Sequence, residues 1–235
     1  MTSILSRASR LLTTTTLRLT EQYPNQHLRS HRFRKLSMDT AGAGPGASDG
    51  VARFPLSASS SLVIQRGDLT KWFVDGTTDA IVNPANERML GGGGADGAIH
   101  RAAGPDLLKA CYSVPEVRPG VRCPTGEARI TAGFKLPASH VIFTVGPIYG
   151  GNPTAPDSLR NAYKNSLRVA KESNIQYIAF PAISCGVYGY PYEEAATVAI
   201  STIKEFANDI KEVHFVMFME EIYFVWLNKA NELLR

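Results

Sequence analysis

Short apolar runs alternate with helix-like segments along this chain of 235 residues, and this alternation constrains its fold more than any other feature. The runs at 80–83 and 141–145 lack polar alternation, which suits strands that are buried on both faces of a sheet. Strands that alternate with helices form βαβ units. The sequence therefore predicts one α/β domain, a three-layer α/β/α sandwich with a largely parallel mixed sheet.

The expected elements place several unusual loops at one edge of that sheet. We expect strands at 61–65, 80–83, 127–132, 141–145, 178–181 and 213–219. We expect helices at 97–103, 106–112, 159 to about 174, 192–207 and 220–234. Polar or glycine-rich segments directly follow strands at 67–68, 83–96, 146–147, 184–190 and 218–219. In open α/β sheets ligands bind outside the carboxyl ends of the strands, so these segments should converge on one cleft.

Composition excludes several classes of protein. The chain is 44% hydrophobic, which is enough for one good core at this length. It holds no apolar run of about 18 residues, so we expect no membrane span. Its three cysteines, Cys111, Cys123 and Cys185, lack metal-ligand spacing, which indicates a reduced interior without structural zinc. We expect neither a metal nor a cofactor.

The first 58 residues differ from the rest of the chain. Residues 1–38 are rich in Ser, Thr and Arg and resemble an organelle transit peptide, for a mitochondrion or a plastid. The alternatives are an ordinary disordered basic tail, or a start at Met38 that gives a cytoplasmic or nuclear form. Residues 39–58 are small and flexible, and we expect a linker. The predicted boundaries are a leader and linker at 1–58 and a folded domain at 59–235.

The net charge of +4 is concentrated in the leader. Residues 1–38 hold seven Lys and Arg and one acidic residue, a net charge of +6, which leaves −2 for the rest. The folded part is therefore not basic. A nucleic-acid partner would depend on the leader alone, and we do not expect one.

Two glycine-rich loops precede helices. Gly91 to Gly94 lie between the strand at 80–83 and a helix, where free N–H groups and the helix dipole favour an anion. We expect a phosphate-binding loop; the alternative is a flexible surface turn. A second loop, 182–191, also opens a helix, so two loops could hold a diphosphate from both sides. Neither loop has the spacing of a nucleotide triphosphatase or of a Rossmann dehydrogenase.

With these loops in view, the chain resembles the macrodomain family, and within it the hydrolytic branch of MacroD-type enzymes and bacterial O-acetyl-ADP-ribose deacetylases. The resemblance extends over about 60–235 without large gaps. The matching runs are Gly-Asp-Leu-Thr (67–70), Asp-Ala-Ile-Val-Asn-Pro-Ala-Asn (79–86), 90–104, Cys-Pro-Thr-Gly-Glu-Ala (123–128), 140–147 and 180–191. Pro84 and Cys185 depart from the usual Ala and Thr of the family.

This resemblance implies a cleft for ADP-ribose and its esters. Asp68 would accept a hydrogen bond from the adenine amino group, next to the Leu69 N–H; alternatively, Asp68 caps its own turn. Tyr188 would pack on the distal ribose and Phe218 near adenine, unless Phe218 belongs to the core. The backbone expected to bind the diphosphate comprises Gly92, Gly93, Gly94, Ala95, Ser184, Cys185, Gly186 and Val187.

The resemblance also implies that Asn86 and Asp96 carry the chemistry. Asn86 would hydrogen-bond the distal ribose and Asp96 would activate water, whereas Asn83 would tie the loop together. The alternative for Asp96 is a cap on a helix that begins near Gly97. We expect a structural imidazole at His100.

Cys185 has no nearby His in the sequence to activate it, so we expect a packed thiol there. The predicted function is hydrolysis of O-acetyl-ADP-ribose and of mono-ADP-ribose esters on acidic side chains of proteins. The alternative function is a non-catalytic ADP-ribose reader.

Overall fold

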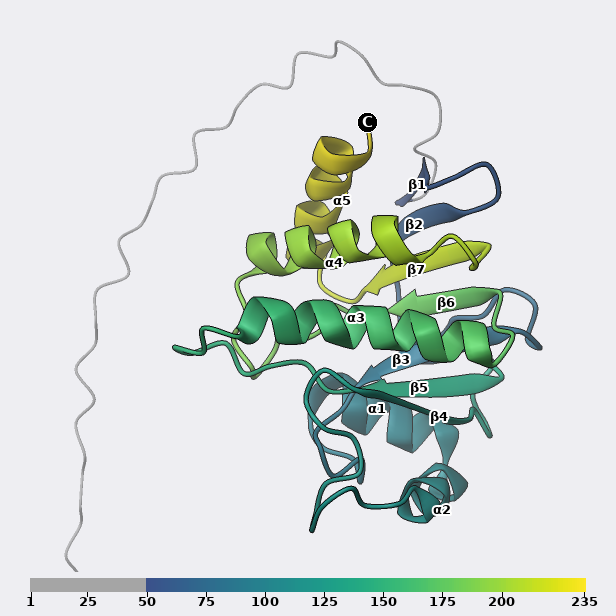
Figure 1. Ribbon diagram of the computed structural model, residues 1–235. Helices are drawn as coiled ribbons and strands as arrows, with labels where there is room; N and C mark the ends of the chain where they lie inside the picture. The colour runs from purple at the N-terminus through teal and green to yellow at the C-terminus, as the bar shows by residue number, and fades with distance from the viewer. Residues whose placement is uncertain (1–49) are drawn as a thin grey trace, which may run out of the picture. The chain divides into compact units, whose positions relative to one another are not determined.

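The computed structural model describes residues 50–235, which form a mixed sheet of seven strands between two layers of helices (Figure 1). The predicted leader and most of the predicted linker lie outside these residues. The strands are β1 (Val51–Pro55), β2 (Ser61–Arg66), β3 (Asp79–Pro84), β4 (Ala128–Ala132), β5 (His140–Thr144), β6 (Tyr177–Phe180) and β7 (Glu212–Met217). The helices are the short η1 (Leu69–Lys71), α1 (Gly94–Ala103), α2 (Pro105–Ser113), α3 (Ala155–Glu172), α4 (Tyr192–Phe206) and α5 (Glu220–Leu234).

The strand order is β1-β2-β7-β6-β3-β5-β4, and the five central strands are all parallel. Only the edge strands β1 and β4 pair antiparallel with their neighbours. The predicted three-layer sandwich with a largely parallel mixed sheet is confirmed. All five central strands therefore have their carboxyl ends at the same edge.

Each face of the sheet has its own hydrophobic core. Helices α3, α4 and α5 cover one face, where Tyr163, Phe180, Phe215 and Trp226 pack their rings together. Helices α1 and α2 cover the other face. Consecutive residues of the central strands point into opposite cores, which explains why those runs are apolar without alternation. Within residues 50–235, no helix is both long and apolar enough to cross a membrane.

The predicted linker extends too far, because Val51–Pro55 forms strand β1. This strand pairs with β2, buries Phe54 to 3% exposure and brings Arg53 to 2.7 Å from Glu212. Strand β1 has only five residues and lies among Gly, Ser and Pro residues, which are typical of a linker. Composition therefore did not indicate a strand here, although the segment pairs in register with β2. The folded part begins before residue 59.

The buried imidazole of His214 on β7 makes the stability of the fold sensitive to pH. Its Nε2 lies 2.9 Å from Glu212 Oε2, and its ring meets the edge of Trp72 at 5.0 Å between centroids. Burial lowers the pKa of His214 below its usual value, and the charge of Arg53 lowers this pKa further. Glu212 and Asp79 raise the pKa but do not offset the effect of burial. The neutral ring is therefore the form that the fold favours.

We expect acid to destabilise the protein through His214. An unfolded imidazole takes up its proton near pH 6.5. The contribution of His214 is therefore complete above that pH and is lost as the pH falls through its lower pKa in the folded chain. Urea unfolding between pH 8 and 5 should show a larger loss of stability for the wild type than for His214→Gln, by at most about 1.4 kcal/mol per pH unit. Equal slopes would assign the pH dependence to other groups.

Candidate functional site

The five segments predicted to form a cleft lie together at the carboxyl edge of the sheet. Hydrogen bonds between neighbouring segments join Gly67 N to Met217 O (3.0 Å) and Ala85 N to Thr144 O (2.9 Å). Gly146 lies so close to Ser184 that a β-carbon would overlap its hydroxyl group. Convergence is therefore confirmed, and it follows from the parallel direction of β2, β7, β6, β3 and β5.

Asp68 caps its own turn. Its Oδ1 accepts hydrogen bonds from Thr70 N (3.0 Å) and Thr70 Oγ1 (2.7 Å), and it is the N-cap of η1. The hydrogen bond from the Thr70 side chain lowers the pKa of this carboxyl group. The other oxygen, Oδ2, lies 3.6 Å from Lys71 Nζ. The capping alternative is thus confirmed, and the cap uses only Oδ1.

The first glycine loop leads directly into α1, which begins at Gly94 rather than at Gly97. Gly91 and Gly94 have positive φ angles of 84° and 57°, a conformation that favours glycine. Residues 92–95 are exposed, and the N-cap Gly93 has no side chain to occupy the first free N–H groups of the helix. This end of α1 therefore presents backbone donors and the positive end of the helix dipole.

Asp96 lies inside the first turn of α1, and Gly93 is the N-cap, so the alternative that Asp96 caps the helix is wrong. The carboxylate is buried at 4% exposure and accepts a hydrogen bond from Asn83 Nδ2 at 2.8 Å. A β-carbon on Gly92 would lie 3.0 Å from Asp96 Oδ2 and 3.3 Å from Asn86 Nδ2. The second carboxylate oxygen and the Asn86 amide therefore meet directly beneath the glycine loop.

Burial raises the pKa of Asp96, while the hydrogen bond from Asn83 and the nearby His100 lower it. Tyr188 is half-buried on the opposite loop, and its pKa is raised by burial and then by the charges of Glu87 and Asp96. The phenol and the carboxylate therefore share one electrostatic environment.

Both asparagines hold the segment between β3 and α1 in place. Asn86 ties the loop, since its Nδ2 donates to Gly91 O at 3.0 Å and its Oδ1 accepts from Arg88 N at 3.1 Å. Asn83 is completely buried and contacts Asp96 instead. This hydrogen bond joins the end of β3 to the first turn of α1 across the glycine loop, so the prediction that Asn83 ties the loop together is confirmed.

His100 packs beneath the same loop. Its ring lies edge-on to Phe143 at 5.9 Å, and a β-carbon on Gly91 would touch it at 3.6 Å. Nε2 lies 3.4 Å from Asp96 Oδ1. These contacts are those expected of a structural imidazole that supports the loop.

The second glycine loop combines a buried beginning with an exposed tip. Ser184 has a φ of 66° and is buried, as is Cys185, whereas Gly186 and Val187 are exposed. Burial raises the pKa of the Cys185 thiol to about 12, so the prediction of a packed thiol is confirmed. Phe218, directly after β7, is 83% exposed and does not belong to the core. The exposed backbone of 186–187 lies at the same sheet edge as the first loop.

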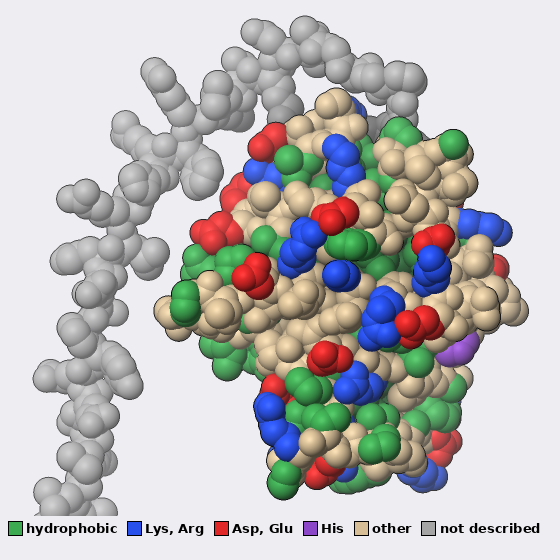
Figure 2. Space-filling view, in the orientation of Figure 1, with side chains coloured by type: hydrophobic (Ala, Val, Ile, Leu, Met, Phe, Trp, Pro, Cys, Tyr) green, Lys and Arg blue, Asp and Glu red, His purple; other side chains and the backbone are tan. Residues whose placement is uncertain are grey.

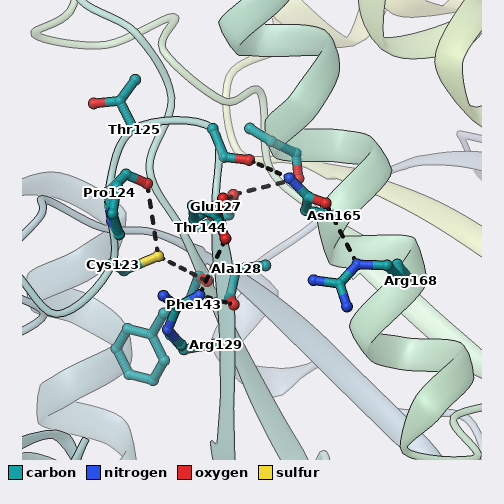
Figure 3. Close-up of polar contacts among 12 residues, drawn as sticks. Cys123, Pro124, Thr125, Glu127, Ala128, Arg129, Phe143, Thr144, Asn165 and Arg168 are labelled. Carbon is teal, nitrogen blue, oxygen red and sulfur yellow. Dashed lines mark hydrogen bonds and ion pairs between the residues drawn. The ribbon is translucent and has the colours of Figure 1, made fainter. Parts of the chain in front are cut away.

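Sequence reasoning missed Glu87, which fastens the loop of Asn86 to the segment before β4. Its Oε1 accepts hydrogen bonds from Thr125 N (3.0 Å) and Oγ1 (3.2 Å), and Arg118 lies 3.3 Å from its Oε2. The segment after Thr125 is held in turn by β5 and α3 (Figure 3). Thr144 Oγ1 of β5 donates to Glu127 O (2.8 Å), and Asn165 Nδ2 of α3 donates to Gly126 O (2.7 Å). The run 123–128 was noticed in the sequence, but its distant partner was not visible there.

Two surface hollows stand out among residues 50–235. The larger, of about 720 Å³, lies between α2, β4 and α3 and includes no predicted site residue. The smaller, of about 460 Å³, lies behind the first glycine loop and is lined by Gly91, Gly92, His100 and Arg101 among others. Among residues 50–235, no three His, Cys, Asp or Glu side chains are grouped to hold a metal ion.

Known proteins are similar to this chain in sequence and in fold. The family model described as Macro domain matches residues 82–199. A macro domain-containing protein of Xanthomonas campestris is 54% identical over 149 residues, 63% of this chain and 81% of the relative. The ADP-ribose glycohydrolase MACROD2 of Homo sapiens is 45% identical over 182 residues, 75% of this chain and 40% of the relative.

A solved structure agrees with the architecture as a whole. The Oceanobacillus iheyensis macrodomain with ADP superposes with a TM-score of 0.72 at 44% sequence identity. The match covers 78% of this chain and 96% of that one. It therefore extends over most of residues 50–235.

Proposed function

Because the chain belongs to the macro domain family, we propose that it binds ADP-ribose and hydrolyses esters of its distal ribose. The proposed substrates are O-acetyl-ADP-ribose and proteins that carry mono-ADP-ribose on acidic side chains. One observation carries the proposal: a buried carboxylate, Asp96, lies directly beneath Gly92 in the first turn of a helix with free N–H groups.

The two glycine loops support the binding part of the proposal. A diphosphate carries negative charge, and the open N-terminus of α1 offers backbone donors for it. The exposed backbone of 186–187 offers a second set of donors at the same sheet edge. Relatives named for ADP and for ADP-ribose are consistent with this ligand class.

The chemistry requires a water molecule to be oriented and deprotonated. In the proposed reaction, Asp96 takes a proton from a water molecule while the oxygen of that water attacks the ester carbonyl carbon. The bond from that carbon to the ribose oxygen then breaks, the departing ribose oxygen takes the proton from Asp96, and a carboxylic acid and ADP-ribose are released. Asn86 fixes the loop above the carboxylate through Gly91. The ligand's own diphosphate is a second candidate base.

A non-catalytic reader is the alternative within the same family. A reader needs both loops but not a buried carboxylate aimed at the space beneath Gly92. Incubating the purified chain with O-acetyl-ADP-ribose and with ADP-ribosylated protein in parallel separates the two. Release of acetate or of ADP-ribose supports the enzyme; tight binding without release of either overturns the hydrolase proposal.

Nucleic-acid binding is not favoured. On the face drawn in Figure 2, basic and acidic side chains are interspersed. Arg160 of α3 pairs with Glu205 of α4 (2.6 Å), and Lys171 of α3 pairs with Asp209 in the loop after α4 (2.8 Å). A nucleic-acid complex would lose affinity steeply with salt, whereas ADP-ribose binding should change little.

Asp68 should contribute to recognition of the adenine. Asp68→Ala should weaken ADP-ribose binding by about 1.5–3 kcal/mol, the range for a hydrogen bond to a charged group. Binding of ribose 5-phosphate should stay nearly unchanged in the same calorimetric titrations. Asp68→Asn is the matched control for the turn, because its amide oxygen still accepts from Thr70. Equal losses for both ligands would mean that Asp68 only holds the turn.

A further inference from the structure

Asn83 and Asp96 form a buried polar pair beneath the first glycine loop. Asn83 is at the end of β3 with no exposed surface, so a ligand in the cleft cannot touch it. Its Nδ2 lies 2.8 Å from Asp96 Oδ1, on the carboxylate oxygen opposite to the one beneath Gly92. The amide therefore holds one oxygen of the carboxylate and leaves the other toward the cleft.

The Asn83 amide uses its donor toward Asp96 and leaves its acceptor without a partner in the described part of the chain. Asn83 Oδ1 is buried and has no hydrogen-bond partner among residues 50–235. A buried acceptor without a partner is destabilising, so a side chain with this defect needs a compensating contact. Turning the amide over would place its oxygen against a carboxylate oxygen. The donor from Asn83 to Asp96 Oδ1 suits an ionised carboxylate, because a carboxylate only accepts hydrogen bonds.

We propose that Asn83 is a positioning residue that keeps the Asp96 carboxylate ionised and directed toward the space beneath Gly92. This inference rests on the proposed function, because it assigns Asn83 a part in the activation of water. Asn83 acts through Asp96 and does not contact the substrate.

The other groups that face Asp96 do not replace this contact. Cys111 on α2 has a thiol whose pKa burial raises to about 12, with a further increase from the charge of Asp96, so it stays neutral. The pKa of Tyr188 on the opposite loop is raised, so the phenol is also neutral. His100 on α1 lies farther away, at 3.4 Å. Asn83 is the donor in closest contact.

Loss of the Asn83 donor should move the pH dependence of turnover. Burial would then act on Asp96 with only His100 to oppose it, so the carboxylate would take up a proton at higher pH. We expect Asn83→Leu, which keeps the branched shape and the number of side-chain heavy atoms but removes the donor, to lower kcat at pH 6 by about tenfold or more. Turnover should recover toward pH 9. The KM and the affinity for ADP-ribose should change by less than about threefold, because the binding loops are untouched.

Asn83→Asp tests the same idea with a different change. Two carboxylates at this distance share one proton, so the acidic limb of the kcat profile should shift further than in Asn83→Leu. This variant also keeps the size and polarity of the side chain. It therefore carries the test if Asn83→Leu does not fold.

The experiment measures kcat and KM for O-acetyl-ADP-ribose from pH 5 to 9 on the full chain, with melting temperatures at each pH. Ser166→Ala is the matched control: it removes a buried 2.7 Å hydrogen bond to Ala162 O on α3, far along the chain from the site. The control should lower stability and leave the pH profile in place. The positioning role would be overturned if the Asn83 variants kept the pH profile of the wild-type kcat and lost turnover only in proportion to their lower melting temperatures. An inactive wild type would instead overturn the proposed function itself.

Discussion

Asp96→Ala should lower turnover of O-acetyl-ADP-ribose by at least ~10²-fold while ADP-ribose still binds. The variant removes the carboxylate beneath Gly92 but leaves the N–H groups of 92–95 in place. An unperturbed Asp is a weak base at pH 7, and burial raises the pKa of Asp96 above that ordinary value. The loss therefore combines proton abstraction with the orientation of water.

The stability of Asp96→Ala should stay close to that of the wild type. The substitution removes the hydrogen bond from Asn83 and leaves that amide unpaired, which is destabilising. It also removes a carboxylate that is costly to bury, and it places alanine in a helix. These effects oppose one another, so thermal unfolding should separate loss of chemistry from loss of fold.

Asp106→Ala is the matched control for this prediction. Asp106 is also in the first turn of a helix, α2, but it is exposed and pairs with Lys109 at 2.7 Å. Its loss should leave turnover unchanged. Wild-type turnover by Asp96→Ala would remove the carboxylate from the mechanism. Retained turnover in Asn86→Ala/Asp96→Ala would leave the enzyme proposal without its chemistry.

Gly97→Ala should weaken ADP-ribose binding by about tenfold or more, although alanine is the better helix former by about 1 kcal/mol. A β-carbon at residue 97 would overlap the carbonyl oxygen of Gly92. Because that contact is with backbone, the glycine loop must move to relieve it. Such overpacking costs about 1–3 kcal/mol, which exceeds the gain in helix propensity.

Calorimetric titration of ADP-ribose and thermal unfolding would measure both effects. Gly150→Ala is the control, since a β-carbon there meets no atom within 4 Å. We expect its affinity and melting temperature to match the wild type. If Gly97→Ala bound ADP-ribose normally and had a higher melting temperature, the close packing of Gly92 against Gly97 of α1 would be unimportant for the ligand.

The sequence itself determined the layers of the fold and the edge at which the site lies. Local spacing carries this information: the apolar runs 80–83 and 141–145 lack alternation because both faces of the sheet are covered. Parallel strands then bring every following loop to one edge. The glycines at 91–94 and their place before a helix could likewise be recognised from the sequence.

Tertiary structure decided which side chains meet at that edge. Asn83 and Asp96 are 13 residues apart, and Glu87 and Thr125 are 38 apart, and no local pattern pairs them. Gly97 of α1 packs so closely against Gly92 that a β-carbon would overlap the Gly92 carbonyl oxygen, and strand β1 pairs in register with β2. Propensity and periodicity act over a few residues, whereas these contacts arise only when the packed helix and sheet fix the distance between distant parts of the chain.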